Sequence, residues 1–435
     1  MKHPPEWRAA LRQEFADWRL WWTRGIVVAV AMLAGLAIVG FTWLSEHALM
    51  LFFALHRLCW WSPLIWTPLC TALIVWLTRR YAPGAAGSGI PQVMAALETG
   101  LDPARRSLFV SLKLSVAKVV LTAWGLLAGL SMGREGPSVQ IAAGVMLLAR
   151  PLAPPNVRPS FHMLLVAGGA AGIAAAFNTP LAGVMFAIEE LSRTPEHRNS
   201  GLIVAAIVLA GLVSVSVHGN ATYFGVIHAP DIGLSLFWSG LLVTLICGIA
   251  GGLFSRLLIA SLRGDGNDAA SRLRMRRPVL FAGVCGLAVA VLGLVTADAT
   301  FGSGYASTRS MIDGAASMPA AYALFKLIAT WLSAWSGVPA GIFAPSLAIG
   351  AGLGNDVALL LHATDTPALI ALGMVGFLAA ATQAPLTSFI IVMEMVDGHA
   401  MVLSLMACAL VASAISRMIS QPLYPTLAGF QLRRV

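Results

Sequence analysis

Residues 118–138 read KVVLTAWGLLAGLSMGREGPS, and residues 326–346 read KLIATWLSAWSGVPAGIFAPS. The two stretches share a lysine, two glycines, a proline and a serine at the same relative positions. Further along, residues 174–190 resemble residues 379–395 in the same way, with a Pro-Leu pair and a later glutamate in common. Matches in one order, separated by similar gaps, predict an internal duplication of the chain.

The chain is too apolar for a soluble domain. Of its 435 residues, 58% are hydrophobic and 11% are charged, whereas soluble domains carry about 25% charged residues. Residues 25–44 and 233–254 are uncharged runs long enough to cross a bilayer, which takes about 20 apolar residues. The apolar segments 138–148, 181–188 and 386–393 are shorter and bounded by Gly or Pro, which is typical of the broken helices of transporters. We expect an all-α polytopic membrane protein.

The basic residues flank the apolar segments, and their placement predicts the topology. Arginines at positions 8, 12, 19 and 24 precede the first long span, so its start is expected on the cytoplasmic side. The equivalent span of the second half follows residues 218–232, which contain no Lys or Arg, and precedes several arginines between positions 263 and 277. Its end is therefore expected on the cytoplasmic side. Equivalent spans point in opposite directions, so the repeat is inverted and its binding site should lie near the midplane.

These features divide the chain into five parts. We expect a cytoplasmic N-terminal segment at 1–24, a first transmembrane repeat at 25–217, an external linker at 218–232, a second repeat at 233–420, and a C-terminal helix with a cytoplasmic end at 421–435. The first residues lack a small-residue cleavage site, so no signal peptide is expected. The five cysteines are scattered singly, and the basic residues form no stripe. We therefore expect no metal, no cofactor and no nucleic-acid partner.

Three Gly-Pro turns are candidates for binding an anion. Residues 133–137 (GREGP) and 341–345 (GIFAP) share the pattern G-x-x-x-P, and residues 87–91 (GSGIP) have a similar composition. Glycine lets the backbone approach a small ligand, and proline suits the first turn of a helix. Such a turn leaves free N–H groups at the positive end of a helix dipole, where an anion binds. The alternative is that these residues only kink helices and allow close packing.

The order of these motifs resembles that of the CLC chloride channel and transporter family. GSGIP at Gly87, GREGP at Gly133, GIFAP at Gly341 and PLY at Pro422 stand in the family's order, and the resemblance extends from about residue 25 to residue 424. It implies a homodimer of inverted-repeat protomers in the cell inner membrane, each with its own chloride pathway. It also implies a central anion site and an outer one. The central site would use the hydroxyls of Ser88 and Tyr424 with backbone N–H groups of Ile342 and Phe343, and the outer site backbone amides near Arg134, Gly136 and Ala344.

Glu135 lies inside the GREGP turn. A carboxylate is favoured at a helix N-terminus, where it occupies the position of an anion. When ionised it would block the pathway, and when protonated it would give way to an external anion. The alternative is a glutamate that only stabilises the helix dipole. Because an ionisable group inside a membrane costs at least about 2.5–3.5 kcal/mol, we favour a functional role, and the resemblance implies that Glu135 is the gating glutamate.

Glu190 falls where the exchangers of this family keep an internal proton-transfer glutamate, which favours coupled exchange over passive conduction. Its neighbour Glu189 is repeated as Glu394 in the other half, so we expect a helix end or a structural hydrogen bond there. Lys118 matches a buried basic position, yet the acids that follow GSGIP in bacterial relatives are replaced here by Gln92 and Met94. We expect Lys118 to be neutral or to bind backbone oxygens.

The sequence thus predicts an H+/Cl− antiporter, with chloride and protons as substrates and the lipid bilayer as partner. Nitrate stays open as an alternative anion, and a passive chloride channel of the same fold stays open as an alternative function. A remote alternative is an intramembrane serine protease, because residues 129–133 (GLSMG) match the G-x-S-x-G pattern around Ser131. That motif requires a strand before the serine and a histidine partner. The nearest downstream histidine is His162, so we expect no enzyme.

Overall fold

The computed structural model describes residues 18–192, 200–219, 222–225, 227, 234–264, 266, 268–314, 318–319, 321–363 and 365–433. Most of the expected N-terminal segment, including Arg8 and Arg12, and most of the expected external linker lie outside the described residues. Within the described ranges the chain is helical, and its one pairing of β type is an isolated bridge between Gly133 and Gly341. The all-α prediction is confirmed.

The helices of the first half precede residue 219. They are α2 (Trp18–Leu58), α3 (Pro63–Tyr81), η1 (Pro83–Ala85), α4 (Ile90–Leu97), α5 (Pro103–Arg106), α6 (Leu112–Leu127), α7 (Glu135–Met146), α8 (Ala149–Leu152), η2 (Pro155–Val157), α9 (Phe161–Phe177), α10 (Pro180–Phe186), η3 (Ala187–Leu191) and α11 (Ser200–His218).

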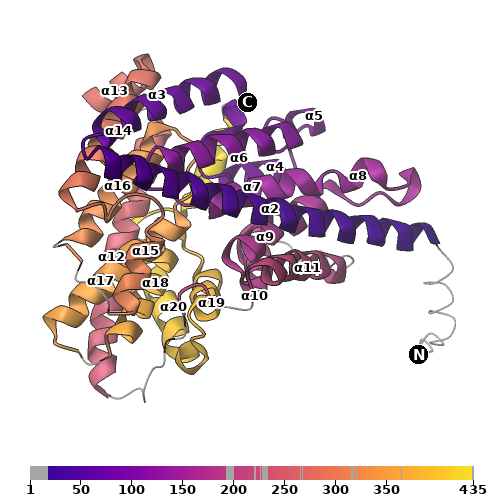
Figure 1. The fold of residues 1–435 in the computed structure, drawn as a ribbon. Helices are drawn as coiled ribbons and strands as arrows, with labels where there is room; N and C mark the ends of the chain where they lie inside the picture. The colour runs from indigo at the N-terminus through magenta and orange to yellow at the C-terminus, as the bar shows by residue number, and fades with distance from the viewer. Residues whose placement is uncertain are drawn as a thin grey trace.

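The helices of the second half follow residue 233. They are α12 (Leu234–Arg263), α13 (Ala269–Arg276), α14 (Pro278–Val295), α15 (Tyr305–Ile312), α16 (Tyr322–Ser336), α17 (Phe343–Leu360), α18 (Thr366–Thr382), α19 (Pro385–Met395), η4 (His399–Met401), α20 (Val402–Ile419) and α21 (Leu423–Leu432). Figure 1 shows the first half in indigo to magenta and most of the second half in orange to yellow, packed side by side.

Five helices of the described chain are long and apolar enough to cross a membrane: α2, α12, α14, α17 and the helical stretch His399–Ile419. Large apolar side chains on their outer surfaces are exposed, among them Trp43, Leu253 and Leu287. Exposed apolar area of this extent requires a lipid environment. The predicted short helices are present as α7, α10 and α19. The chain is a multi-pass membrane protein.

Small residues let the central helices approach closely. In the first half α7 packs against α9, and in the second half α17 packs against α18. A Cβ atom at Gly168 of α9 would lie 2.7 Å from the Cα of Ala143 on α7, closer than real contacts allow. Gly350 and Gly373 face each other between α17 and α18 in the same way. Glycine at these contacts permits the van der Waals packing that holds membrane helices together.

Two glutamates cap short helices of the opposite half. Glu189 accepts hydrogen bonds from the backbone N–H groups of Leu386 and Thr387, at 3.0 and 2.7 Å, at the start of α19. Glu394 accepts from Leu181 and Ala182, at 3.2 and 2.8 Å, at the start of α10. A carboxylate at a helix N-terminus pairs free N–H groups and complements the dipole. The structural hydrogen bond predicted for Glu189 is confirmed.

We expect Glu189→Gln and Glu394→Gln to destabilise the protein by similar amounts, because each removes one charged cap from an equivalent helix. The loss should be about 1 kcal/mol for each cap. Thermal unfolding in detergent measures it, with Glu98→Gln as the matched control, since Glu98 is exposed and caps no helix N-terminus. If the variants at positions 189 and 394 have the same melting temperature as the Glu98→Gln control, the capping role is contradicted.

Candidate anion-binding site

The two G-x-x-x-P turns meet at the centre of the protein. The N–H of Gly133 donates to the carbonyl of Gly341 at 2.8 Å, and the N–H of Gly341 donates to the carbonyl of Gly133 at 3.0 Å. A Cβ atom at Gly341 would lie only 2.8 Å from the Gly133 oxygen, so the pairing requires glycine. Because α7 and α17 begin two residues after these glycines, their N-termini lie close together.

The GSGIP turn is hydrogen-bonded to the segment that precedes the Gly341 turn. The N–H of Gly87 donates to the carbonyl of Val338, and the N–H of Ala340 donates to the carbonyl of Gly87, both at 3.2 Å. Gly87 and Gly89 have φ values of 76° and 111°, a conformation that favours glycine. The turn is thereby attached to the segment that leads into α17.

Lys118 is fully buried, and its side chain binds the backbone at the start of the GSGIP turn. Its Nζ donates to the carbonyls of Ala85 and Gly87 at 2.8 and 2.6 Å, so the expected binding of backbone oxygens is confirmed. A planar trans peptide points its C=O and N–H in opposite directions. With the Gly87 carbonyl directed at Lys118, the N–H of Ser88 points away from the lysine. Lys326 makes the equivalent bonds in the second half, to Thr300 and Gly302 at 3.0 and 2.8 Å.

Glu135 joins the two halves. Its side chain is 1% exposed, and its Oε2 accepts a hydrogen bond from the backbone N–H of Ala344 at 3.3 Å. Ala344 is in the first turn of α17, so the carboxylate lies at the positive end of a helix from the opposite half. The space it occupies exists because Gly133 has no side chain, since a Cβ there would collide with Oε2. The structure brings together the two motifs that the sequence singled out.

The side chain of Arg134 is directed away from this point. Its Nη1 donates to Glu46 Oε1 at 2.8 Å, and its Nη2 donates to the hydroxyl of Tyr223 at 3.2 Å. These groups line a cavity of about 660 Å³ together with Thr42 and Tyr305. The sequence could not identify these partners, because Glu46 is 88 positions from Arg134 and no motif marks it. The charge of Arg134 therefore lies at this cavity, while its backbone leads into α7.

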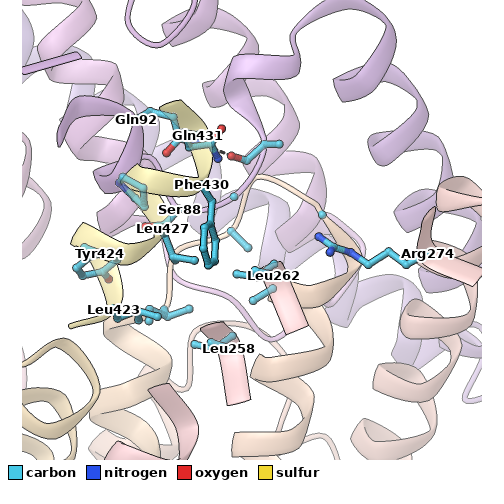
Figure 2. Close-up of a pocket in the computed structure, with 17 residues that line it drawn as sticks. Ser88, Gln92, Leu258, Leu262, Arg274, Leu423, Tyr424, Leu427, Phe430 and Gln431 are labelled. Atoms are coloured by element: carbon cyan, nitrogen blue, oxygen red, sulfur yellow. Dashed lines mark hydrogen bonds between the residues drawn. The ribbon is translucent and has the colours of Figure 1, made fainter. Parts of the chain in front are cut away.

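Ser88 and Tyr424 lie together at a second cavity. Ser88 Oγ and Tyr424 Oη are near each other and buried, and neither makes a hydrogen bond of normal geometry within the described chain. With Ile342 they line a cavity of about 90 Å³, shown in Figure 2. The ring of Phe343 stacks on that of Tyr424, with centroids 6.0 Å apart. Two buried hydroxyls that need an acceptor, beside a helix N-terminus, suit an anion.

Gly136 connects the cavity to the Glu135 turn. A Cβ atom at Gly136 would collide with Ser88 Oγ, so the backbone of α7 directly abuts the serine. The predicted chloride-binding residues therefore fall into two adjacent groups. Ser88, Ile342 and Tyr424 line the cavity, with Phe343 stacked on Tyr424 behind it, and the Ala344 N–H donates to the Glu135 carboxylate, which follows Arg134 and precedes Gly136 in the chain.

Glu190 lies apart from both groups. It is 8% exposed, at the end of α10 in the π-helical turn η3, and it lines a third cavity of about 400 Å³. Glu98 and His162 line the same cavity. Pro425, Ala428 and Gly429 of α21 also line it, whereas Leu423, Tyr424 and Leu427 of that helix line the Ser88 cavity. Thus α21 separates the two cavities. Sequence reasoning did not connect Glu98 or His162 with Glu190.

Within the described residues, helix N-termini of a helical membrane protein converge on buried hydroxyls and a carboxylate. This arrangement is typical of one class of protein, the membrane proteins that transport anions. Comparison with known proteins identifies the family within this class. Residues 70–417 match the model of the family described as voltage gated chloride channel, so the chain belongs to the CLC family.

Several bacterial relatives align with nearly the whole chain. An H(+)/Cl(-) exchange transporter ClcA of Cronobacter sakazakii is 31% identical over 93% of this chain and 88% of the relative. That of Citrobacter koseri is 30% identical over 87% and 80%. Among solved structures, a slow cyanobacterial Cl−/H+ antiporter has a TM-score of 0.80 at 23% identity, covering 95% of this chain and 98% of its own. A CLC-type fluoride/proton antiporter has a TM-score of 0.74 at 23% identity, covering 94% and 98%.

Proposed function

We propose that this protein exchanges chloride for protons across the cell inner membrane. The observation that carries the proposal is the hydrogen bond from the Ala344 N–H to the Glu135 carboxylate, which puts a titratable side chain where an anion would bind. The names of the bacterial relatives, which are about 30% identical, support exchange over passive conduction.

In this mechanism chloride and the Glu135 carboxylate compete for one position. A central chloride accepts hydrogen bonds from the hydroxyls of Ser88 and Tyr424 and from the N–H groups of Ile342 and Phe343. An outer chloride uses the amides near Arg134, Gly136 and Ala344, which hold the carboxylate while it is ionised. Protonation removes its charge and weakens its bond to the positive end of α17, so that chloride replaces it. Binding of a proton and binding of chloride are thereby linked.

In this mechanism protons from the cytoplasmic side reach Glu135 through Glu190. Glu190 is almost fully buried yet borders a cavity, which suits a group that takes up protons and passes them inward. A passive channel has no use for a buried acid in this place. The separation of this cavity from that of Ser88 by α21 keeps the proton route away from the hydroxyls that bind chloride.

The remaining parts of the proposal concern assembly and topology. Both termini are cytoplasmic, the two halves are inverted repeats, and the protein is a homodimer that uses chloride and protons without a cofactor or metal. The geometry does not favour the serine-protease alternative, because Ser131 Oγ is hydrogen-bonded to Thr330 Oγ1 at 2.9 Å rather than to a histidine. The chain before Ser131 is the helix α6, not a strand.

Flux in liposomes tests the proposal. The purified protein is reconstituted, a chloride gradient is imposed, and the internal and external pH are recorded while the membrane potential is clamped with valinomycin and potassium. An exchanger drives protons against their gradient under these conditions. Chloride flux without such proton movement would establish the passive channel instead.

A further inference from the structure

Side chains from three helices bind the backbone that leads to Ser88. Four successive carbonyls, those of residues 84–87, each accept a hydrogen bond from a buried side chain. Gln140 Nε2 donates to Gly84 at 2.9 Å, Lys118 Nζ donates to Ala85 and Gly87 at 2.8 and 2.6 Å, and Gln92 Nε2 donates to Ala86. The donors belong to α7, α6 and α4. These bonds determine how the chain enters the GSGIP turn.

Gln92 binds the turn on both sides of Ser88. Its Nε2 donates to the carbonyl of Ala86, and its Oε1 accepts a hydrogen bond from the N–H of Gly89 at 3.0 Å. An amide side chain can make both bonds because it carries a donor and an acceptor at the same end. Gln92 is 1% exposed, in the first turn of α4, and Figure 2 shows it at the wall of the Ser88 cavity. One side chain thus closes the turn around Ser88.

The two peptide groups that flank Ser88 are both held by side chains. Lys118 binds the carbonyl of the peptide that joins Gly87 to Ser88, and Gln92 binds the N–H of the peptide that joins Ser88 to Gly89. Each peptide is planar, so the orientations of these two planes define the φ and ψ of the serine between them. With the backbone fixed, the hydroxyl is limited to the staggered positions about one bond. The position of the Ser88 hydroxyl therefore depends on Gln92.

We propose that Gln92 is a positioning residue for the central chloride site and sets its affinity by holding the Ser88 hydroxyl toward the ion. The proposal rests on the proposed function, in which the hydroxyls of Ser88 and Tyr424 donate to one chloride. A binding group keeps its strength only when the residues behind it fix its geometry. The amide of Gln92 is engaged by the backbone of the turn, so it acts on the ion through Ser88.

The test is a double-mutant cycle between Gln92→Met and Ser88→Ala. Methionine has a similar length and no charge, but it can make neither bond of the turn. Chloride affinity is measured by isothermal titration calorimetry of the detergent-solubilised protein. Each single variant should raise the dissociation constant by about tenfold, because each weakens a hydrogen bond to a charged group. The double variant should bind chloride about as weakly as Ser88→Ala alone, because residues that act through one contact are not additive.

Two further variants make the result specific. Gln431→Met removes an amide from the same cavity wall without removing a bond of the turn, so it should bind chloride like the wild type. Gln92→Asn is one methylene too short to keep both bonds, and it repeats the cycle with a polar side chain if methionine prevents folding. The proposal is wrong if the Gln92 variants keep wild-type affinity, if Gln431→Met is equally weak, or if the effects at positions 92 and 88 simply add.

Flux in liposomes separates this proposal from the proposed function. In Gln92→Met the half-saturating chloride concentration should rise, while the maximal rate and the ratio of protons to chloride stay near those of the wild type. A fall in maximal rate with unchanged half-saturation would contradict the role of Gln92. A wild type that binds chloride but drives no protons would overturn the exchange function alone, and a wild type that binds no chloride would overturn both.

Discussion

Replacing Glu135 by Gln is expected to stop proton movement completely and to leave a chloride flux that no longer depends on pH. The carboxylate accepts the Ala344 N–H at the positive end of α17, and its charge is what lets it compete with chloride there. Glutamine has nearly the same size but no charge at any pH, so it neither blocks the site as an anion does nor carries a proton. Proton flux should fall to the leak of protein-free liposomes.

The measurement is paired recording of chloride and proton flux from liposomes between acidic and neutral pH. Ser131→Ala is a suitable control, because Ser131 is buried in the same segment and its hydroxyl bonds only to Thr330 in the described structure. This variant should exchange like the wild type, and a loss of activity in it would revive the protease alternative. A Glu135→Gln protein that still moves protons uphill would show that another group carries them.

Replacing Glu190 by Gln should also stop proton movement, but the remaining chloride flux should respond to pH differently from that of Glu135→Gln. Glu190 lines the cavity on the far side of α21, away from the hydroxyls of Ser88 and Tyr424, so its loss leaves the chloride site intact. Chloride should continue to flow. Because Glu135 is still present and titrates from the outer side, that flux should keep its dependence on external pH, unlike the flux of Glu135→Gln.

The neighbouring glutamate provides a matched control for this result. Glu189→Gln removes an acid one position away, but Glu189 bonds to the backbone of α19 and does not line the Glu190 cavity. It should lower stability and keep the wild-type ratio of protons to chloride. Equal uncoupling of both variants would mean that local disruption, rather than loss of a proton carrier, explains the effect.

The sequence predicts those parts of the structure that depend on local backbone chemistry. The Gly-x-x-x-P turns were expected to begin helices, and α7 and α17 do begin two residues after Gly133 and Gly341. The structure adds a two-way backbone bridge between these glycines. The duplication also predicted a structural role for Glu189, because Glu394 repeats it, and the two cap each other's short helices. The CLC family follows from motif order, and the family comparison confirms it.

Tertiary contacts between polar residues could not be predicted. Glu46 and Tyr223 are distant in sequence from Arg134, and each would pass for a surface or interfacial residue. Arg274 belongs to the group of arginines between positions 263 and 277 from which the sequence predicts a cytoplasmic helix end, and only the packing of α12, α13 and α16 brings this one to the cavity wall. Helix length was also underestimated: α2 extends over Trp18–Leu58, since an uncharged window identifies only the part of a helix within the bilayer core.

The central claim is that helix N-termini from both halves form one anion position that the Glu135 carboxylate and chloride share. Crystals of Glu135→Gln grown in bromide test it most directly, because bromide substitutes for chloride and its anomalous scattering locates it without ambiguity. We predict a bromide ion where the carboxylate oxygen lies in the wild type, within hydrogen-bonding distance of the Ala344 N–H. An anomalous map with no ion at that position, while bromide occupies the Ser88 and Tyr424 cavity, would contradict the claim.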